Sequence, residues 1–411
     1  MGGSLREKIM IRRQLLTFTA AAALAAGSLF GTAAAAQDVI KLGAIAPKTG
    51  PLAGGAVVTQ WPNVELWVAQ VNARGGLQVG DSKMMIELIQ YDDKTNPGEH
   101  IKLAQRLAEQ DKVDFVVAPY GTGFNIATAP IYGRYGYPMI AVSAITDKME
   151  ELTERYPNLF FTLGTTTAFV DGVKEILIEQ RDAGVIGNEI AMVNVADAFG
   201  IELADRARDL FTEAGFELVY DKSYPLGTPD LSPVMKGAKD SGAKAFVAWS
   251  YPPDSFGLAE QAIIEDLDVN LYYSAVATSF PAFKGAYGNK INNVLGAGGT
   301  NVDDPKIAAY REAHKEITGE VADYWASANT YAALQILEQA IEGAGTLDRE
   351  VVTQYIKDNT FDTVMGMLTF ENQVSHTYWS VGQWQDGVFR GVKGTNVDGA
   401  VPVRPKSGWS E

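Results

Sequence analysis

Hydroxyl and glycine residues cluster in two short segments of the chain. The first reads Pro119-Tyr120-Gly121-Thr122-Gly123-Phe124, and the second reads Ser143-Ala144-Ile145-Thr146-Asp147. A hydroxyl beside free backbone N–H groups at a helix N-terminus can bind a carboxylate without a cation, because the helix dipole and the oriented donors supply positive potential. The alternative is an ordinary N-cap in each segment, which needs only one hydroxyl. Since both segments follow the same logic, we favour one paired carboxylate site.

Aromatic and acidic residues stand in similar positions elsewhere. A glycine-rich segment at 47–55 leads to Trp61, which either closes over a ligand or packs in a core. Later segments offer aromatic walls and acidic partners for a ligand: Phe199, Tyr251, Phe280, Asp197 and Asp254. For each of the two acids the alternative is a helix N-cap, which fits Asp254 better than Asp197.

The composition excludes several kinds of site. The 411 residues include no cysteine and three histidines, so the chain has no disulfide, thiol nucleophile or Cys-ligated metal. The formal net charge of −16 opposes binding to nucleic acid, which requires clustered Lys and Arg. No P-loop, GxSxG, HExxH or EF-hand motif occurs, and Gly296-Ala297-Gly298 lacks the third small residue of a dinucleotide fingerprint. We therefore expect neither an enzyme nor a cofactor.

Short apolar runs alternate with helical patterns along most of the chain. Runs at 39–46, 84–91, 115–118 and 138–142 predict strands, and the segments at 57–71, 97–109 and 124–134 between them predict helices. After a bridging piece at 159–163 the alternation starts again and continues to residue 274. Such alternation predicts parallel strands with crossover helices, here in two doubly wound units that the C-terminal segments complete. Ligands of such sheets bind at the carboxyl ends of the strands, where the segments named above lie.

The N-terminus has the pattern of a cleaved export signal. Arg12-Arg13 precede an apolar stretch from Leu15 to Phe30, and Ala34-Ala35-Ala36 then fit a signal peptidase. We expect residues 1–36 to be removed. The alternative, a membrane anchor, is weaker because the apolar run is short and rich in Ala, Gly and Thr. Without a cysteine after the signal, the protein has no lipid anchor there, and we expect it in the periplasm.

Six short motifs occur in a fixed order along the remaining chain. They are Thr49-Gly50-Pro51-Leu52-Ala53, Asn72-Ala73-Arg74-Gly75-Gly76, Tyr91-Asp92-Asp93 with Asn96-Pro97, Tyr137-Pro138-Met139-Ile140, Phe199-Gly200, and Gly382-Gln383-Trp384 with Asp386-Gly387. In this order the chain resembles periplasmic solute-binding proteins of the leucine/isoleucine/valine type, which serve ABC uptake transporters. The resemblance covers essentially all of the chain after the signal.

The resemblance implies an α/β fold of two doubly wound, Rossmann-like lobes joined by three hinge crossovers, the type I periplasmic binding protein fold. It places the N-terminal lobe at 38–160 plus 298–372 and the C-terminal lobe at 161–297 plus 373–411. It also implies a monomer that closes on one small ligand without chemistry and then docks on a membrane permease. The alternative is a sensing subunit for a membrane signalling receptor; the lack of a fused signalling segment favours transport.

The resemblance also implies roles for single residues. The ligand carboxylate falls on Thr122, with Gly121 and Gly123 beside it, and on Ala144, Ile145 and Thr146. Aromatic positions of the family fall on Phe199 and Trp61. The acid that pairs an amino acid's ammonium group in the family falls on Val276, and a buried ammonium without a counter-charge is costly. Either Asp197 or Asp254 replaces that acid, or the ligand is an aromatic or other apolar carboxylate.

Overall fold

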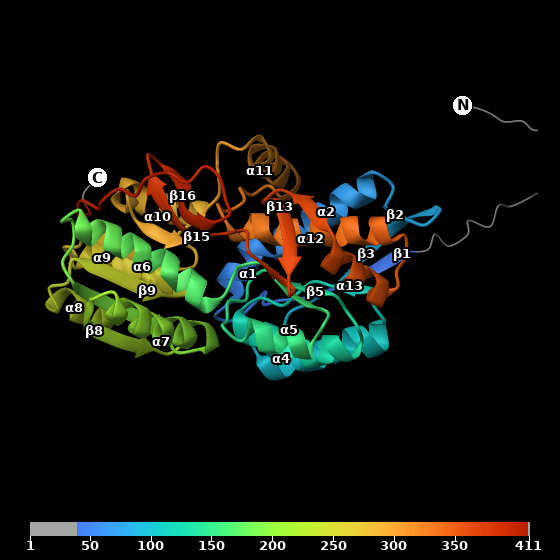
Figure 1. Cartoon of the computed structure of the whole chain (residues 1–411), viewed down its shortest axis with the longest axis horizontal. Helices are drawn as coiled ribbons and strands as arrows, with labels where there is room; N and C mark the ends of the chain where they lie inside the picture. Colours follow the sequence, from blue (N-terminus) through green and yellow to red (C-terminus); the bar gives the residue numbers. More distant parts are fainter. Residues whose placement is uncertain (1–38, 410–411) are drawn as a thin grey trace, which may run out of the picture. The chain divides into compact units, whose positions relative to one another are not determined.

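Strands and helices alternate through residues 39–409, the part of the chain that the computed structural model describes (Figure 1). The predicted signal at 1–36 lies outside these residues. The strands are β1 (Val39–Ile45), β2 (Leu77–Val79), β3 (Ser82–Tyr91), β4 (Phe115–Val116), β5 (Met139–Ala141), β6 (Leu159–Phe161), β7 (Glu189–Val195), β8 (Glu217–Tyr224), β9 (Ala245–Trp249), β10 (Leu271–Ser274), β11 (Leu295–Ala297), β12 (Thr360–Thr363), β13 (Gly366–Glu371), β14 (Val374–Ser375), β15 (Tyr378–Gln385) and β16 (Val388–Thr395). The α-helices are α1 (Ala53–Thr59), α2 (Trp61–Ala73), α3 (Pro97–Arg106), α4 (Thr122–Arg134), α5 (Met149–Arg155), α6 (Thr166–Asp182), α7 (Ala198–Glu213), α8 (Ser232–Asp240), α9 (Pro252–Ile264), α10 (Pro281–Tyr287), α11 (Pro305–Thr318), α12 (Ala326–Ala344) and α13 (Arg349–Asp358).

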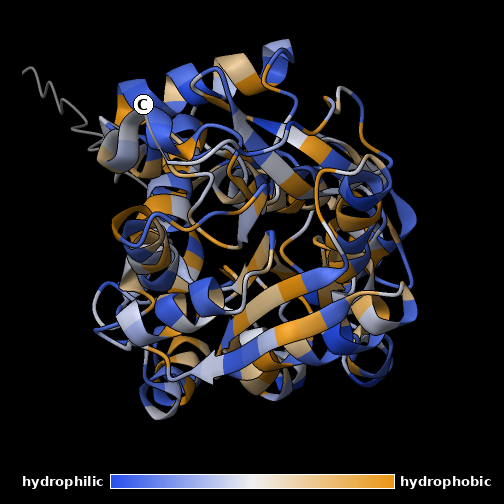
Figure 2. Ribbon diagram, turned by 90° about the vertical axis from the view of Figure 1, so that its left-hand side faces the viewer, coloured by the Kyte–Doolittle hydropathy of each residue, from blue (hydrophilic) through white to orange (hydrophobic). Residues whose placement is uncertain are grey.

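One sheet has seven strands in the order β16-β15-β11-β10-β9-β7-β8. Its strands from β8 to β11 pair in parallel, and β15 and β16 add an antiparallel hairpin. Every residue of β9 is buried, as expected for a strand that helices cover on both faces. Figure 2 shows apolar strand segments in orange, with many polar residues in blue on the surrounding helices.

The other strands form two sheets, with the orders β2-β3-β1-β4 and β12-β13-β14-β6-β5. The sequence predicted one sheet here, and this prediction was wrong. β4 has only two residues and pairs with β1. Just beyond it, the carbonyl of Ala118 accepts a hydrogen bond from the side chain of Gln60 at 3.0 Å, which takes the place of a strand partner.

The same Gln60 separates two helices where the sequence predicted one helix over 57–71. α1 ends at Thr59 and α2 begins at Trp61, with Pro62 in its first turn, where proline is tolerated. The short elements β2, α5 and α10 were not predicted at all. Three-residue strands and seven-residue helices carry too few residues for a periodic pattern to appear.

We call the elements of the four- and five-stranded sheets the first lobe and those of the seven-stranded sheet the second lobe. The chain passes between them after β6, after β11 and after β14. The predicted two-lobe α/β fold is thus confirmed, while the residue boundaries of the lobes stay a prediction. One detail bears on them: β14 follows the expected boundary at residue 372 but pairs with β6 of the first lobe.

No helix within residues 39–409 combines the length and the apolar character that crossing a bilayer requires.

Candidate functional site

Within the described residues, the N-terminus of α4 carries no side-chain cap. Gly121 occupies its N-cap with φ at 94°, a left-handed conformation that favours glycine, and no side chain caps the helix. Ser143 fixes this turn, since its hydroxyl accepts from the Gly121 amide and donates to the Pro119 carbonyl, both at 3.0 Å. The first N–H groups of α4 therefore have no side-chain acceptor among residues 39–409, which is the arrangement that binds an anion.

Thr122 ties the two predicted loops together. Its hydroxyl accepts from the Ile145 amide at 3.2 Å and donates to the Ile145 carbonyl at 3.4 Å. Thr122, Ala144 and Ile145 are all buried. The structure thus brings the segments 119–124 and 143–147 side by side, as the paired site requires, but it engages the Thr122 hydroxyl within the protein.

Two aromatic side chains of the first lobe, Tyr120 and Trp61, were further candidates for the site. Tyr120 packs on α1, where a Cβ added to Gly55 would stand 1.9 Å from the Tyr120 hydroxyl oxygen. Burial and the negative charge of Asp323 raise the pKa of Tyr120. Trp61 is buried and its indole N–H has no partner in the part of the chain that the structure describes, while the ammonium of Lys48 lies 4.5 Å from the ring centroid.

The second lobe supplies an aromatic wall with acidic residues behind it. The rings of Phe199 and Tyr251 lie 4.9 Å apart between centroids. Asp197 caps α7 by accepting from the Gly200 amide at 2.9 Å, and Asp254 accepts from the Tyr251 amide at 3.3 Å. Asp197 is therefore the N-cap of α7, as the alternative has it. The N-cap of α9 is Tyr251, and Asp254 is the third residue of that helix, so the expectation that an N-cap fits Asp254 better than Asp197 was wrong.

Burial makes both carboxyl groups unusual acids. It raises the pKa of Asp197, against the opposing effect of hydrogen bonds from the Gly200 amide and the Tyr251 hydroxyl. Burial also raises the pKa of Asp254 to about 6, where the Tyr251 amide opposes the rise and the charge of Asp197 adds to it. Neither acid has a cation within salt-bridge distance in the described part of the chain.

The two lobes meet at these residues. A Cβ added to Gly121 would lie 3.6 Å from the Tyr251 hydroxyl oxygen, and one added to Gly123 would lie 3.7 Å from the Ala198 Cβ. The open end of α4 therefore faces the start of α7 and the aromatic ring of Tyr251. This juxtaposition of the segments 119–124, 143–147 and 197–199 with Tyr251 is the candidate ligand site.

Val276 and Phe280 differ in their surroundings. The Val276 amide donates to the Ser250 carbonyl at 3.1 Å, and the Val276 carbonyl accepts from the Ser255 hydroxyl at 2.5 Å. Val276 itself is 9% exposed. Phe280 lines a cavity of about 400 Å³ with residues of α1, α2 and α11, and no other predicted site residue lines that cavity. The contacts thus give no support to Phe280 as a wall of the α4 site.

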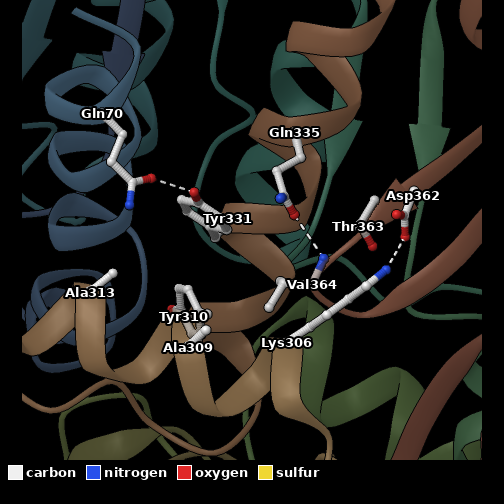
Figure 3. Close-up of a pocket in the computed structure, with 10 residues that line it drawn as sticks. All are labelled: Gln70, Lys306, Ala309, Tyr310, Ala313, Tyr331, Gln335, Asp362, Thr363 and Val364. Atoms are coloured by element: carbon white, nitrogen blue, oxygen red, sulfur yellow. Dashed lines mark hydrogen bonds and ion pairs between the residues drawn. The ribbon is translucent and has the colours of Figure 1, made fainter. Parts of the chain in front are cut away.

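A further cavity, of about 430 Å³, lies between α2, α11, α12 and β12 (Figure 3). Its polar groups are largely satisfied by one another: Tyr331 bonds Gln70, Lys306 pairs with Asp362, and Gln335 accepts from the Val364 amide at 2.8 Å. None of the predicted site residues lines it.

Three residues near the site escaped the sequence analysis. Asp323 caps α12 and accepts from the Ser279 hydroxyl of the second lobe at 3.0 Å. The indole N–H of the neighbouring Trp325 is buried and has no partner among the described residues. Glu202 of α7 accepts from the Thr146 hydroxyl at 2.9 Å. An acid just before a helical pattern is a signal that could have revealed Asp323, whereas nothing in the sequence links Thr146 to Glu202.

No group of three His, Asp or Glu side chains within residues 39–409 is arranged as a metal site.

Comparisons with known proteins agree with this architecture. A family model described as periplasmic binding protein matches residues 39–388. A Leu/Ile/Val-binding protein homolog 7 from Brucella suis biovar 1 is 25% identical over 389 residues, which cover 89% of this chain and 94% of the relative.

Two solved structures share the fold. The branched-chain amino acid transporter substrate binding protein LivJ from Streptococcus pneumoniae, in complex with isoleucine, matches with a TM-score of 0.74 and 21% identity over 86% of this chain and 98% of its own. A solute binding protein of an ABC transporter from Rhodopseudomonas palustris BisB5, in complex with 3,4-dihydroxybenzoic acid, matches with a TM-score of 0.75 and 19% identity. The match covers 89% of this chain and 99% of that protein's chain. At these identities the likeness concerns the fold alone.

Proposed function

The chain belongs to the periplasmic binding protein family, and from this membership we propose that it captures a small carboxylate between its lobes and delivers it to an ABC permease. The curated relatives carry the Leu/Ile/Val-binding name, which supports the branched-chain amino acid type of transporter. Proteins of this family are solute-binding proteins rather than enzymes. The predicted export signal supports a place in the periplasm, where the protein acts as a monomer.

The uncapped N-terminus of α4 is the observation that carries this proposal. Its free N–H groups, with the Gly121 turn held by Ser143, are a suitable seat for the ligand carboxylate. Opposite them stand the rings of Phe199 and Tyr251, which suit an apolar or aromatic body. A ligand bound there contacts both lobes at once and so favours their closure.

The acids of the site argue against an amino acid as the preferred ligand. Asp197 and Asp254 both accept from a backbone amide at the start of a helix, and burial raises the pKa of both. Val276 is apolar where the family resemblance implies an acid. A buried ammonium group would therefore lack a dedicated counter-charge. We propose an aromatic or aliphatic carboxylate without an ammonium group, a ligand of the class of the 3,4-dihydroxybenzoic acid bound by one neighbour rather than of the isoleucine bound by another.

A thermal-shift panel followed by calorimetry tests the proposal. Benzoate and its hydroxylated derivatives should raise the melting temperature and bind with a stoichiometry of one, while leucine and isoleucine should bind at least about tenfold more weakly. Stronger binding of the amino acids would overturn the ligand assignment. Compaction in small-angle scattering on addition of the best ligand tests the closure, and no compaction would contradict it.

A further inference from the structure

The carboxylate of Glu202, in the second lobe, accepts several hydrogen bonds from the loop 143–147 of the first lobe. Glu202 accepts hydrogen bonds from the Thr146 hydroxyl at 2.9 Å, the Asp147 amide at 2.6 Å and the Thr166 hydroxyl at 3.1 Å. The Thr146 oxygen also accepts from the Lys148 amide at 3.1 Å. The Thr146 hydroxyl therefore uses its one hydrogen in the bond to Glu202.

An ion pair lies beside this contact, and here the acid belongs to the first lobe and its partner to the second. The Asp147 carboxylate accepts from Nε and Nη2 of Arg206, at 3.1 Å and 3.0 Å. It also accepts from the amide and the hydroxyl of Thr167, both at 2.8 Å. The Asp147 amide therefore donates to Glu202, and the Asp147 carboxylate accepts from Arg206.

The elements that carry these residues belong to different lobes. Glu202 and Arg206 lie four positions apart on α7, so they share one helix face. α7 packs against β7, β8 and β9 of the seven-stranded sheet, whereas Thr146 and Asp147 follow β5 of the five-stranded sheet. Thr166 and Thr167 open α6, the first helix after the chain leaves β6.

We propose that Glu202 and Arg206 form an interlobe latch with Thr146 and Asp147, which stabilises the closed form and sets ligand affinity without touching the ligand. The inference rests on the proposed function, because it assumes that the lobes open and close. Hydrogen bonds to ionised groups are the stronger kind, and these exist only while the two lobes touch. Since apparent affinity scales with the fraction of molecules that can close, Glu202 and Arg206 act as positioning residues for every ligand alike.

The absence of cysteine makes a direct measurement possible. Lys102 of α3 and Lys236 of α8 are both exposed and lie in different lobes. Spin labels on cysteines introduced at these two positions report the interlobe distance by double electron–electron resonance. The variants to compare are Glu202→Ala, Glu202→Gln, Arg206→Ala and the matched control Glu213→Ala, an exposed acid on the same helix. Urea unfolding of each variant without ligand checks that the fold is intact.

In the wild-type protein we expect a short distance corresponding to this structure. Glu202→Ala should lower the ratio of closed to open molecules about tenfold. It should weaken 3,4-dihydroxybenzoate and isoleucine by one common factor, the factor by which the closed fraction falls. Glu202→Gln keeps one acceptor, so its closed-to-open ratio and its affinities should lie between those of the wild type and Glu202→Ala. Glu213→Ala should match the wild type in both. The ratio of the two affinities should not change in any variant.

Other results separate the latch from the proposed function. Unchanged distances and affinities in Glu202→Ala would overturn the latch, as would a changed affinity ratio, which would place Glu202 on the ligand. A wild-type protein that never shows the short distance would overturn it as well. If Glu202→Ala alters the distances but no carboxylate or amino acid does, the latch stands and the proposed function fails.

Discussion

Position 276 offers a test of why an ammonium group is disfavoured. Replacing Val276 by Glu should place a carboxylate where the family resemblance implies one, and the neutral Val276→Gln variant matches it in size. We expect Val276→Glu to strengthen isoleucine binding about tenfold and to weaken benzoate binding, because the new charge attracts an ammonium and repels a carboxylate. Calorimetry with both compounds provides the measurement. Equal effects of Glu and Gln would show that only volume matters at this position.

Asp254 should make the folded protein sensitive to pH. Burial raises its pKa to about 6 in the folded state, above the usual value for an unfolded chain. The folded state therefore binds more protons between about pH 4 and 6, so the free energy of unfolding from this group falls as the pH rises through that window. Asp254→Asn keeps an acceptor for the Tyr251 amide and carries no charge. It should remove this slope and raise the free energy of unfolding at pH 8 by about 1–2 kcal/mol.

Urea unfolding at pH 4.5, 6 and 8 checks the prediction for Asp254. Asp240→Asn, which removes an exposed acid at the end of α8, is the control and should leave the pH dependence as in the wild type. A lower stability of Asp254→Asn at pH 8 would mean that the ionised cap favours the fold despite its burial.

The start of α4 and the loop after β5 depend on one hydroxyl. Thr122→Val would leave the buried amide and carbonyl of Ile145 without their partner. We expect the free energy of unfolding to fall by about 1–3 kcal/mol and carboxylate binding to weaken, because the loop opposite α4 loses its tie. Thr122→Ser retains the hydroxyl and should stay close to the wild type in both. Unchanged carboxylate affinity in Thr122→Val would remove Thr122 from the site.

Elements with a strong pattern could be predicted from the sequence, and this covers most of the fold. The all-apolar run at 245–249 predicts a strand and the amphipathic pattern at 168–181 predicts a helix, and β9 and α6 begin and end within about two residues of these bounds. Loops after such strands were correctly expected to converge, since the carboxyl ends of parallel strands share an edge. Gly121, Thr122, Ser143 and Ile145 are accordingly in contact.

What the sequence could not predict depends on contacts between distant segments. The side chain of Gln60, between α1 and α2, donates to the Ala118 carbonyl far along the chain, a contact that no local pattern encodes. Thr146 looked like a ligand hydroxyl, yet Glu202 on α7 engages it, and α7 itself displays an ordinary amphipathic pattern. No local propensity encodes such a partner, because it arises from the docking of one lobe on the other.

The lobes also approach each other between α1 and α9. A Cβ added to Gly54 of α1 would lie 3.9 Å from the Cβ of Pro252 at the start of α9. α1 belongs to the first lobe and packs on α2, whereas α9 follows β9 of the seven-stranded sheet. The separation matches the Cβ–Cβ distance of a disulfide, about 3.8 Å. Since the chain has no cysteine of its own, a pair introduced here can form one defined intramolecular bond.

The double variant Gly54→Cys/Pro252→Cys should therefore lock the molecule in the closed form when it is oxidised. Oxidation after a bound carboxylate is added should slow its release at least about a hundredfold, and oxidation before addition should block binding, because the ligand enters only between separated lobes. Reduction should restore both rates. The two single-cysteine variants control for the substitutions themselves. Free exchange of ligand through the oxidised protein, with the disulfide verified by mass spectrometry, would show that the ligand reaches its site without separation of the lobes.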